Sequence, residues 1–120
     1  MSVVLDTNTV MYFLGGKLAQ PLPDDDYTVS VITQIELLSY PLLSPDDEQH
    51  VLEFLTTVTV IDLSAEIRDA AIRLRRNHRL KLPDSIIAGT AVSLGVVLLT
   101  NDRRLARTPD LRCQIVAVKP

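Results

Sequence analysis

Short runs of β-branched and aliphatic residues alternate along this chain with longer segments of helical spacing. The short runs predict strands at residues 3–6, 27–31, 58–61, 96–99 and 115–118. Parallel strands need a long crossover between them, and that crossover is usually a helix. The alternation therefore predicts an α/β fold with a mostly parallel sheet of four to five strands flanked by helices. With 120 residues and no linker or repeat, we expect one domain covering residues 1–120.

The segments between the runs carry signals for the start and end of helices. Ser44 and Ser64 are typical N-cap residues, and Pro83 suits the first position of a helix. Gly15 and Gly95 are typical of the residue that follows a helix. We predict helices that end at residue 14 and that cover residues 32–40, 45–55, 65–78 and 83–94, with a helical turn at 102–107.

Two carboxylates stand at the ends of predicted strands. Asp6 follows the first strand and Asp102 follows the fourth, so in a parallel sheet both would project at the carboxyl edge, where such folds bind ligands. Asp6 could instead simply cap the next helix. Each aspartate has hydroxyl and amide neighbours that can orient it or hold a metal-bound water, namely Thr7, Asn8, Thr100 and Asn101.

Two further carboxylates lie on predicted helices. Glu36 lies among aliphatic residues on a helix that we expect to be mostly buried, where an unpaired carboxylate is costly; an exposed stripe is the alternative. Thr33 shares its helix face. Asp84 lies in the first turn of its helix, where the helix dipole alone could explain it. Small residues follow it and would let this helix approach the sheet closely: Ser85, Ala88, Gly89 and Ala91.

The charges of the two halves of the chain differ in sign. Residues 1–60 carry nine acidic and one basic side chain, whereas residues 61–120 carry six acidic and eleven basic ones. Four converging carboxylates repel one another, and a bound divalent cation is the simplest way to neutralise this repulsion. A basic second half beside them suits a phosphate-backbone substrate, although a solvated helix face would explain it too. Arg103, Arg104 and Arg107 are the predicted phosphate-binding residues.

The remaining features favour a cytoplasmic protein that needs no disulfide bond. Cys113 is the only cysteine and cannot pair within the chain, so we expect a structural thiol in a reducing compartment. Neither a basic leader nor a long apolar span is visible, which predicts a cytoplasmic chain with no membrane segment. We expect His50 and His78 to be ordinary surface residues, and the acidic run at 24–26 to be a solvated loop instead of a calcium site.

Four motifs occur in a defined order: L-D-T-N at the start, then I-T-Q-I-E-L-L, L-P-D-S-I-I-A-G-T-A and L-L-T-N-D-R-R-L. This set resembles the PIN-domain ribonucleases, most closely the VapC-type toxins of prokaryotic toxin–antitoxin pairs, and the resemblance covers essentially the whole chain. It implies that Mg²⁺ or Mn²⁺ binds to Asp6, Glu36, Asp84 and Asp102, supported by Thr7, Asn8, Thr33, Thr100 and Asn101. It further implies hydrolysis of RNA phosphodiester bonds.

A protein partner is the last expectation. The first two helices carry more apolar surface than would be buried by packing one face of each helix against a sheet. The remaining apolar surface suits an amphipathic partner helix. The resemblance implies that this partner is a cognate antitoxin protein, which can place a basic side chain among the carboxylates, and the toxin is expected to be a homodimer. The alternative is that these residues fill the core.

Other protein classes fit the sequence less well. A bacterial receiver domain needs an acidic pair after its first strand and an aspartate after its third, whereas here Asp6 stands alone and Asp62 leads straight into a helix cap. A phosphatase of the haloacid dehalogenase type needs an aspartate where Asn8 stands. A PIN-fold RNA-processing nuclease outside a toxin pair and a non-catalytic PIN binding module remain open alternatives.

Overall fold

Five parallel strands form one sheet in the order β3-β2-β1-β4-β5 in the computed structural model, which describes residues 2–120. All four neighbouring pairs in this sheet run parallel. The strands are β1 (Ser2–Leu5), β2 (Asp26–Ser30), β3 (Thr59–Ile61), β4 (Val97–Thr100) and β5 (Cys113–Ile115). The predicted α/β fold is therefore confirmed, with five strands.

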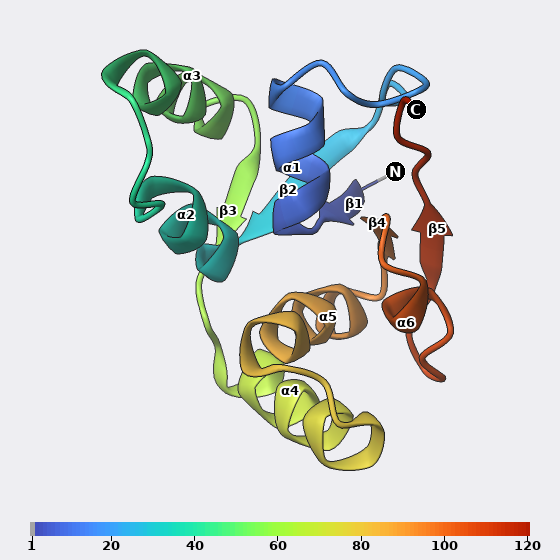
Figure 1. Cartoon of the computed structure of the whole chain (residues 1–120). Coiled ribbons are helices and arrows are strands. Elements are labelled where there is room, and N and C mark those ends of the chain that lie inside the picture. The colour runs from blue at the N-terminus through green and yellow to red at the C-terminus, as the bar shows by residue number, and fades with distance from the viewer. Residues whose placement is uncertain (1) are drawn as a thin grey trace.

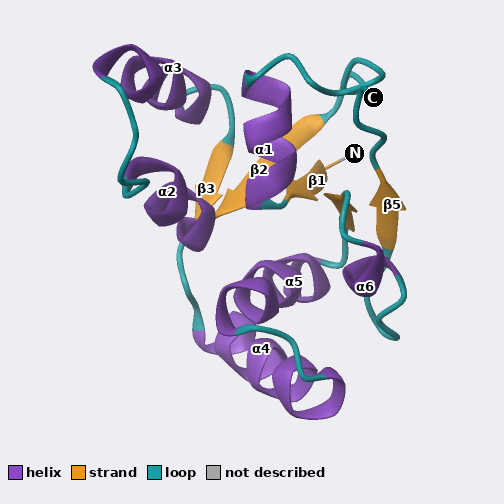
Figure 2. Cartoon of the chain, in the orientation of Figure 1, coloured by secondary structure: helices purple, strands orange, loops and turns teal. Residues whose placement is uncertain are grey.

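Six helices connect and cover these strands within residues 2–120 (Figures 1 and 2). They are α1 (Thr7–Leu14), α2 (Val31–Leu38), α3 (Pro45–Leu55), α4 (Ala65–His78), α5 (Leu82–Leu94) and α6 (Arg103–Ala106). Figure 1 shows α1 and α3 on one side of the sheet and α5 on the other, with α4 packed outside α5. None of the helices in this part of the chain combines the length and apolar character that crossing a bilayer demands.

Alternate residues of the central strands enter two separate cores. Val4 and Leu98 pack with α4, α5 and α6, whereas Val3, Leu5 and Leu99 pack with α1, α2 and α3. This alternation is the two-residue period of a strand. Because both faces of the sheet are covered, the central strands β1 and β4 are apolar over most of their length, as expected for a parallel sheet.

The small residues of α5 do not all face the sheet as predicted. Ala88 and Ala91 do pack with Val4 and Leu98. Gly89 instead faces α4, where an added Cβ would lie 3.0 Å from the backbone nitrogen of Ala71 and 3.1 Å from the carbonyl oxygen of Ile67. The glycine is therefore needed for the close packing of two helices, and the prediction of an approach to the sheet is wrong for this residue.

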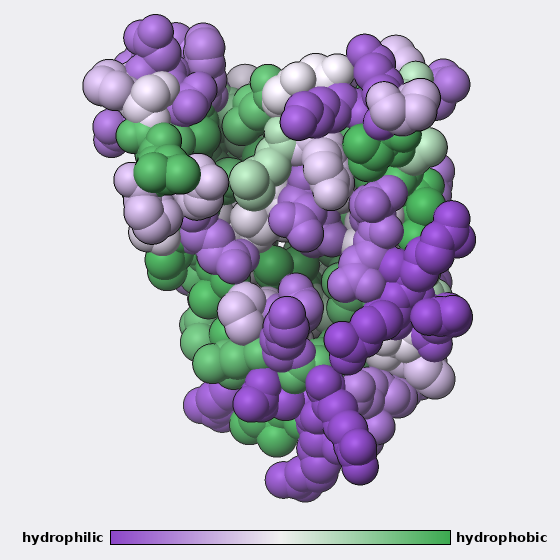
Figure 3. Space-filling view, viewed as in Figure 1, coloured by the Kyte–Doolittle hydropathy of each residue, from purple (hydrophilic) through white to green (hydrophobic). Residues whose placement is uncertain are grey.

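The last strand is also displaced from its predicted place. It covers Cys113–Ile115 and not residues 115–118, because its partner β4 ends at Thr100, which lies opposite Ile115. Beyond this point Val118 forms a single antiparallel bridge with Leu18. Figure 3 shows hydrophilic residues gathered toward the lower and right parts of the face that it presents, over α4 and α6.

Candidate active site

The strand order reverses between β1 and β4, the two central strands of the sheet. From β1 the sheet continues to β2 and β3 on one side, and from β4 to β5 on the other. Open α/β sheets bind their ligands at the carboxyl edge of such a switch point. Asp6 directly follows β1, and Asp102 follows β4 by two residues. The fold thus brings the first and last sequence motifs to one place.

Asp6 is a buried carboxylate with defined partners for both oxygens, its exposed fraction being 6%. Its Oδ1 accepts a hydrogen bond from the Thr9 backbone nitrogen at 2.8 Å, which caps α1. Its Oδ2 accepts one from the hydroxyl of Thr100 on the neighbouring strand. Asp6 is therefore a helix cap and also a part of the switch point, and these two interpretations do not exclude each other.

Glu36 is exposed, contrary to the buried environment predicted for it. Helix α2 is short and packs at the edge of the sheet through Thr33 and Leu37, so Ile35 and Glu36 point outward. The Glu36 carboxylate is still held, because the Thr7 hydroxyl donates to its Oε1 at 2.7 Å. Thr7 also shares a hydrogen bond of 3.0 Å with the buried Thr33 hydroxyl, so Thr33 supports Glu36 through Thr7.

The pKa of Asp84 reflects the charges around it. Burial raises the pKa of this carboxyl above its usual value, and Asp102, Asp6 and Glu36 raise it further in that order, whereas Lys81 lowers it. All three other carboxylates are therefore electrostatic neighbours of Asp84. Such a field favours either a retained proton or a bound cation.

Asp102 lies at the rim of this group. It is exposed and caps the short helix α6 by accepting a hydrogen bond from the Arg104 backbone nitrogen at 2.8 Å. Its own backbone nitrogen donates to the Thr100 hydroxyl at 2.9 Å. Thr100 therefore connects Asp102 to Asp6.

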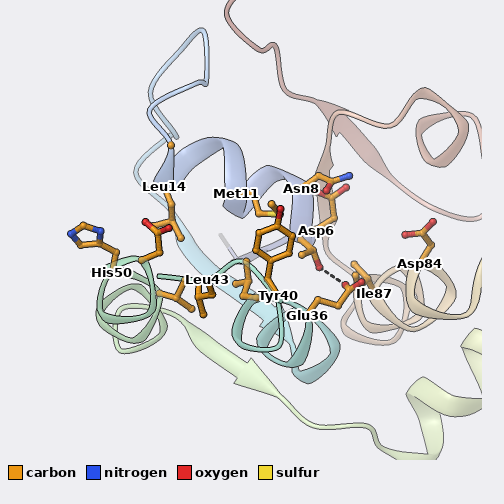
Figure 4. A pocket seen from close by; sticks show the side chains of 15 residues that line it. Asp6, Asn8, Met11, Leu14, Glu36, Tyr40, Leu43, His50, Asp84 and Ile87 are labelled. Atoms are coloured by element: carbon orange, nitrogen blue, oxygen red, sulfur yellow. Dashed lines mark hydrogen bonds between the residues drawn. The ribbon is translucent and has the colours of Figure 1, made fainter. Parts of the chain in front are cut away.

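A cavity of about 480 Å³ opens at the switch point. Figure 4 shows Asp6, Asn8, Glu36 and Asp84 at one end of it and Leu14, Leu43 and His50 toward the other. Asp102 does not line it. The cavity thus joins an acidic end to an apolar groove between α1, α2 and α3.

Of the residues that line the groove, those of α3 were missed by the sequence analysis, whereas the apolar surface of the first two helices was predicted. His50, predicted to be an ordinary surface residue, is exposed but lines the cavity together with Asp47 and Val51 of the same helix. The spacing of three to four residues between these side chains is a helix-face signal that could have identified them. The spacing could not indicate that this face of α3 lies toward α1 and α2.

Some predicted site residues have other roles in the structure. The Asn101 amide donates to the Val116 carbonyl oxygen at 2.7 Å and so braces the segment after β5. Arg103, Arg104 and Arg107 are exposed, and within residues 2–120 they form no ion pair. They remain available to an anion beside Asp102.

The donor set suits a hard cation. Carboxylate, hydroxyl and amide oxygens are the ligands that Mg²⁺ and Mn²⁺ prefer, and they line the acidic end of the cavity in Asp6, Thr7, Asn8, Glu36 and Asp84. Among residues 2–120, no three His, Cys, Asp or Glu side chains are grouped closely enough to bind one ion together. The chemistry of the residues thus fits a divalent metal, with the carboxylates placed around an opening.

The fold and the acidic switch point define a PIN domain. Residues 3–111 match the PIN domain family, and the chain belongs to it. Its fold is similar to that of a chain in VapBC2 from Rickettsia felis bound to a promoter DNA fragment, with a TM-score of 0.81, 21% identity and coverage of 97% of this chain and 99% of that one. The motif-based resemblance is therefore confirmed for family and fold.

Two further structures are similar at higher identity. A chain of the DNA-bound VapBC from Salmonella typhimurium gives a TM-score of 0.79 at 25% identity, covering 96% of this chain and 98% of that one. A toxin–antitoxin complex from Klebsiella pneumoniae gives 0.76 at 28% identity, covering 91% and 94%. The comparison with curated proteins found no match.

Proposed function

We propose that this protein is a Mg²⁺- or Mn²⁺-dependent ribonuclease that acts in the cytoplasm as the toxin of a toxin–antitoxin pair. The observation that carries the proposal is the electrostatic coupling of Asp84 to Asp102, Asp6 and Glu36 at the switch point of a PIN domain. A carboxylate whose pKa is raised by neighbouring carboxylates in a cleft is stabilised in its charged form by a cation.

The four carboxylates Asp6, Glu36, Asp84 and Asp102 would hold the metal. A bound divalent ion supplies an activated water and stabilises charge on a phosphodiester. The chain's own contribution is orientation: Thr100 fixes Asp6, and Thr7 fixes Glu36. Hydrogen-bonded partners of this kind hold ligating carboxylates in one conformation.

The proposed substrate is RNA, bound through its phosphates. Arg103, Arg104 and Arg107 project beside Asp102 and have no acidic partner in the described part of the chain. Each phosphate that a cation neutralises releases counterions, so neutralising all three arginines should weaken RNA binding and flatten its dependence on salt.

The toxin role draws on the VapBC structures and on the groove. Its apolar end, between α1, α2 and α3, suits an amphipathic helix of an antitoxin, and the adjacent carboxylates would accept a basic side chain of that partner. We also propose that the toxin is a homodimer. An RNA-processing nuclease outside a toxin pair would have the same centre but no inhibitory partner.

The nuclease is tested with purified protein and a fluorescent single-stranded RNA. Wild type should cleave in Mg²⁺ or Mn²⁺ and not in excess EDTA, and Asp6→Asn and Asp84→Asn should be inactive. Asp110→Asn is the matched control, because Asp110 is exposed and its φ of 69° suits asparagine. Undiminished cleavage in EDTA would reject the metal mechanism.

The toxin role is tested separately in bacterial hosts. Expression of the wild type should arrest growth, whereas Asp6→Asn at the same soluble level should not. Equal growth of both strains in several hosts would reject the toxin role and leave the nuclease in place.

A further inference from the structure

A run of cations covers the end of α4 and its connection to α5. Between Asp69 and Asp84 the chain has no acidic residue and five basic ones, Arg73, Arg75, Arg76, Arg79 and Lys81. All five are exposed, and none forms an ion pair within residues 2–120. Figure 3 shows hydrophilic residues gathered over α4, the helix that precedes this connection. Like charges without counter-charges destabilise a compact chain, so this surface suits a polyanion.

The backbone of this connection is fixed by three contacts. Arg79 adopts a left-handed conformation with φ of 56°, and its N–H donates to the Arg75 carbonyl oxygen at 3.0 Å. The Arg75 guanidinium in turn donates to the Leu80 carbonyl oxygen at 3.0 Å. Leu80 is anchored in the core with Val4. The position of the next residue, Lys81, is therefore set before any ligand binds, which lowers the entropy cost of binding.

The side chain of Lys81 does not cap helix α5. Its carbonyl oxygen accepts the first bond of α5, from the Ser85 nitrogen at 2.9 Å, but its side chain makes no capping hydrogen bond. At the corresponding position of α4, Ser64 does cap the helix. A cation at the positive end of a helix is unfavourable, so helix stability does not explain this lysine.

Lys81 nevertheless lies beside the acidic centre. It is the N-cap residue of α5, and Asp84, which lines the acidic end of the cavity, follows it by three residues in the first turn of the same helix. The electrostatics agree with this placement, because Lys81 lowers the pKa of Asp84 against the effect of burial and of the other carboxylates. The α4–α5 connection thus ends in a cation beside a carboxylate of the centre.

Building on the proposed ribonuclease activity, we propose that Lys81 binds a phosphate of the RNA at the acidic centre. The RNA backbone then runs from Arg103, Arg104 and Arg107 on one side of the carboxylates to the α4–α5 connection on the other. A phosphate entering a group of carboxylates meets repulsion, which an ammonium at the rim offsets. Lysine binds phosphate as a point charge and needs no fixed fork geometry.

A purely structural role for Lys81 would be an ion pair with Asp84 across the first turn of α5. Pairs at this spacing contribute only about 0.2–0.5 kcal/mol and would be indifferent to RNA. RNA affinity as a function of salt separates the two roles, because only a phosphate contact adds to the slope of log affinity against log salt.

The experiment measures binding of a fluorescent single-stranded RNA to variants made in the cleavage-deficient Asp6→Asn background. Lys81→Met should reduce the slope by about 0.7, so that the parent loses about three-fold more affinity than the variant between about 50 and about 200 mM salt. Lys81→Arg should keep the parental slope. Lys119→Met, which removes the same charge from an exposed site on the segment after β5, should also keep it.

The outcomes distinguish this inference from the proposed function. If Lys81→Met and Lys119→Met give the same slope while the wild type cleaves RNA, Lys81 makes no phosphate contact and the nuclease stands. If the RNA binds with the predicted slopes but the wild type does not cleave it, the inference holds and the nuclease fails. If the parent binds no RNA, the inference about Lys81 is rejected, and cleavage by the wild type decides the nuclease separately.

Discussion

Thr100 at the end of β4 donates a hydrogen bond from its hydroxyl to Oδ2 of Asp6 at the end of β1. The same hydroxyl accepts a bond from the Asp102 backbone nitrogen, and Thr100 is fully buried. One side chain therefore ties two acidic residues of the centre together. Because Thr100 is held in the core, the position of Asp6 is set by the sheet itself.

Thr100→Val should destabilise the protein while keeping its shape. The substitution leaves the buried Asp6 carboxylate without one of its donors, which costs about 1–3 kcal/mol of unfolding free energy. Thr100→Ser keeps a hydroxyl and should recover most of this loss. Urea denaturation monitored by circular dichroism measures the difference, and equal stability of the two variants would contradict this role for the hydroxyl.

The metal-free protein should become less stable as pH rises through the pKa of Asp84. Burial and then the neighbouring carboxylates raise this pKa in the folded state, so the folded chain holds a proton that the unfolded chain has already lost. Stability in EDTA should therefore fall between the usual aspartate pKa and the raised one. Asp84→Asn should abolish this fall and be at least as stable as the wild type at neutral pH.

Divalent metal should stabilise the folded protein. An ion that binds the assembled carboxylates but not the unfolded chain adds about 2.7 kcal/mol at an ion concentration about 100 times Kd. Thermal denaturation should show a higher Tm with Mg²⁺ or Mn²⁺ for the wild type and a much smaller rise for Asp6→Asn. An equal rise for both proteins would place the ion elsewhere.

Cys113 should be unreactive in the folded state. Burial, then Asp6 and Asp102, raise the pKa of its thiol from 9.0 to about 11. This lowers the thiolate fraction at neutral pH on the order of 100-fold, and alkylation requires the thiolate. Iodoacetamide labelling followed by mass spectrometry should be slow for the native protein and fast in urea. Fast native labelling would show that the thiol is neither buried nor near these carboxylates.

Gly89→Ala should destabilise the packing of α5 on α4. The new methyl group would lie 3.0–3.1 Å from backbone atoms of α4, which cannot move like a side chain. Overpacking costs about 1–3 kcal/mol, and against backbone neighbours we expect this cost to exceed the gain of about 1 kcal/mol from better helix propensity. Asn77→Ala at an exposed position of α4 is the control for propensity alone and should not destabilise.

Local signals in the sequence determined most of the elements. Ser64 and the apolar spacing that follows it predicted α4 with its observed bounds, Ala65–His78, because a cap and a helix face depend on neighbours within a few residues. The aspartates after β1 and β4 were predicted at one edge, because parallel strands that alternate with helices share their carboxyl edge.

Tertiary structure decided what depends on residues far apart in the chain. The bounds of β5 follow from where β4 ends, and Glu36 is exposed because α2 packs at the edge of the sheet through Thr33 and Leu37. The groove beside the carboxylates exists because α3 meets α1 and α2. The backbone before Lys81 is fixed by the hydrogen bond from Arg75 to Leu80 and by the packing of Leu80 in the core. Each of these outcomes is set by packing between distant segments, which local spacing does not encode.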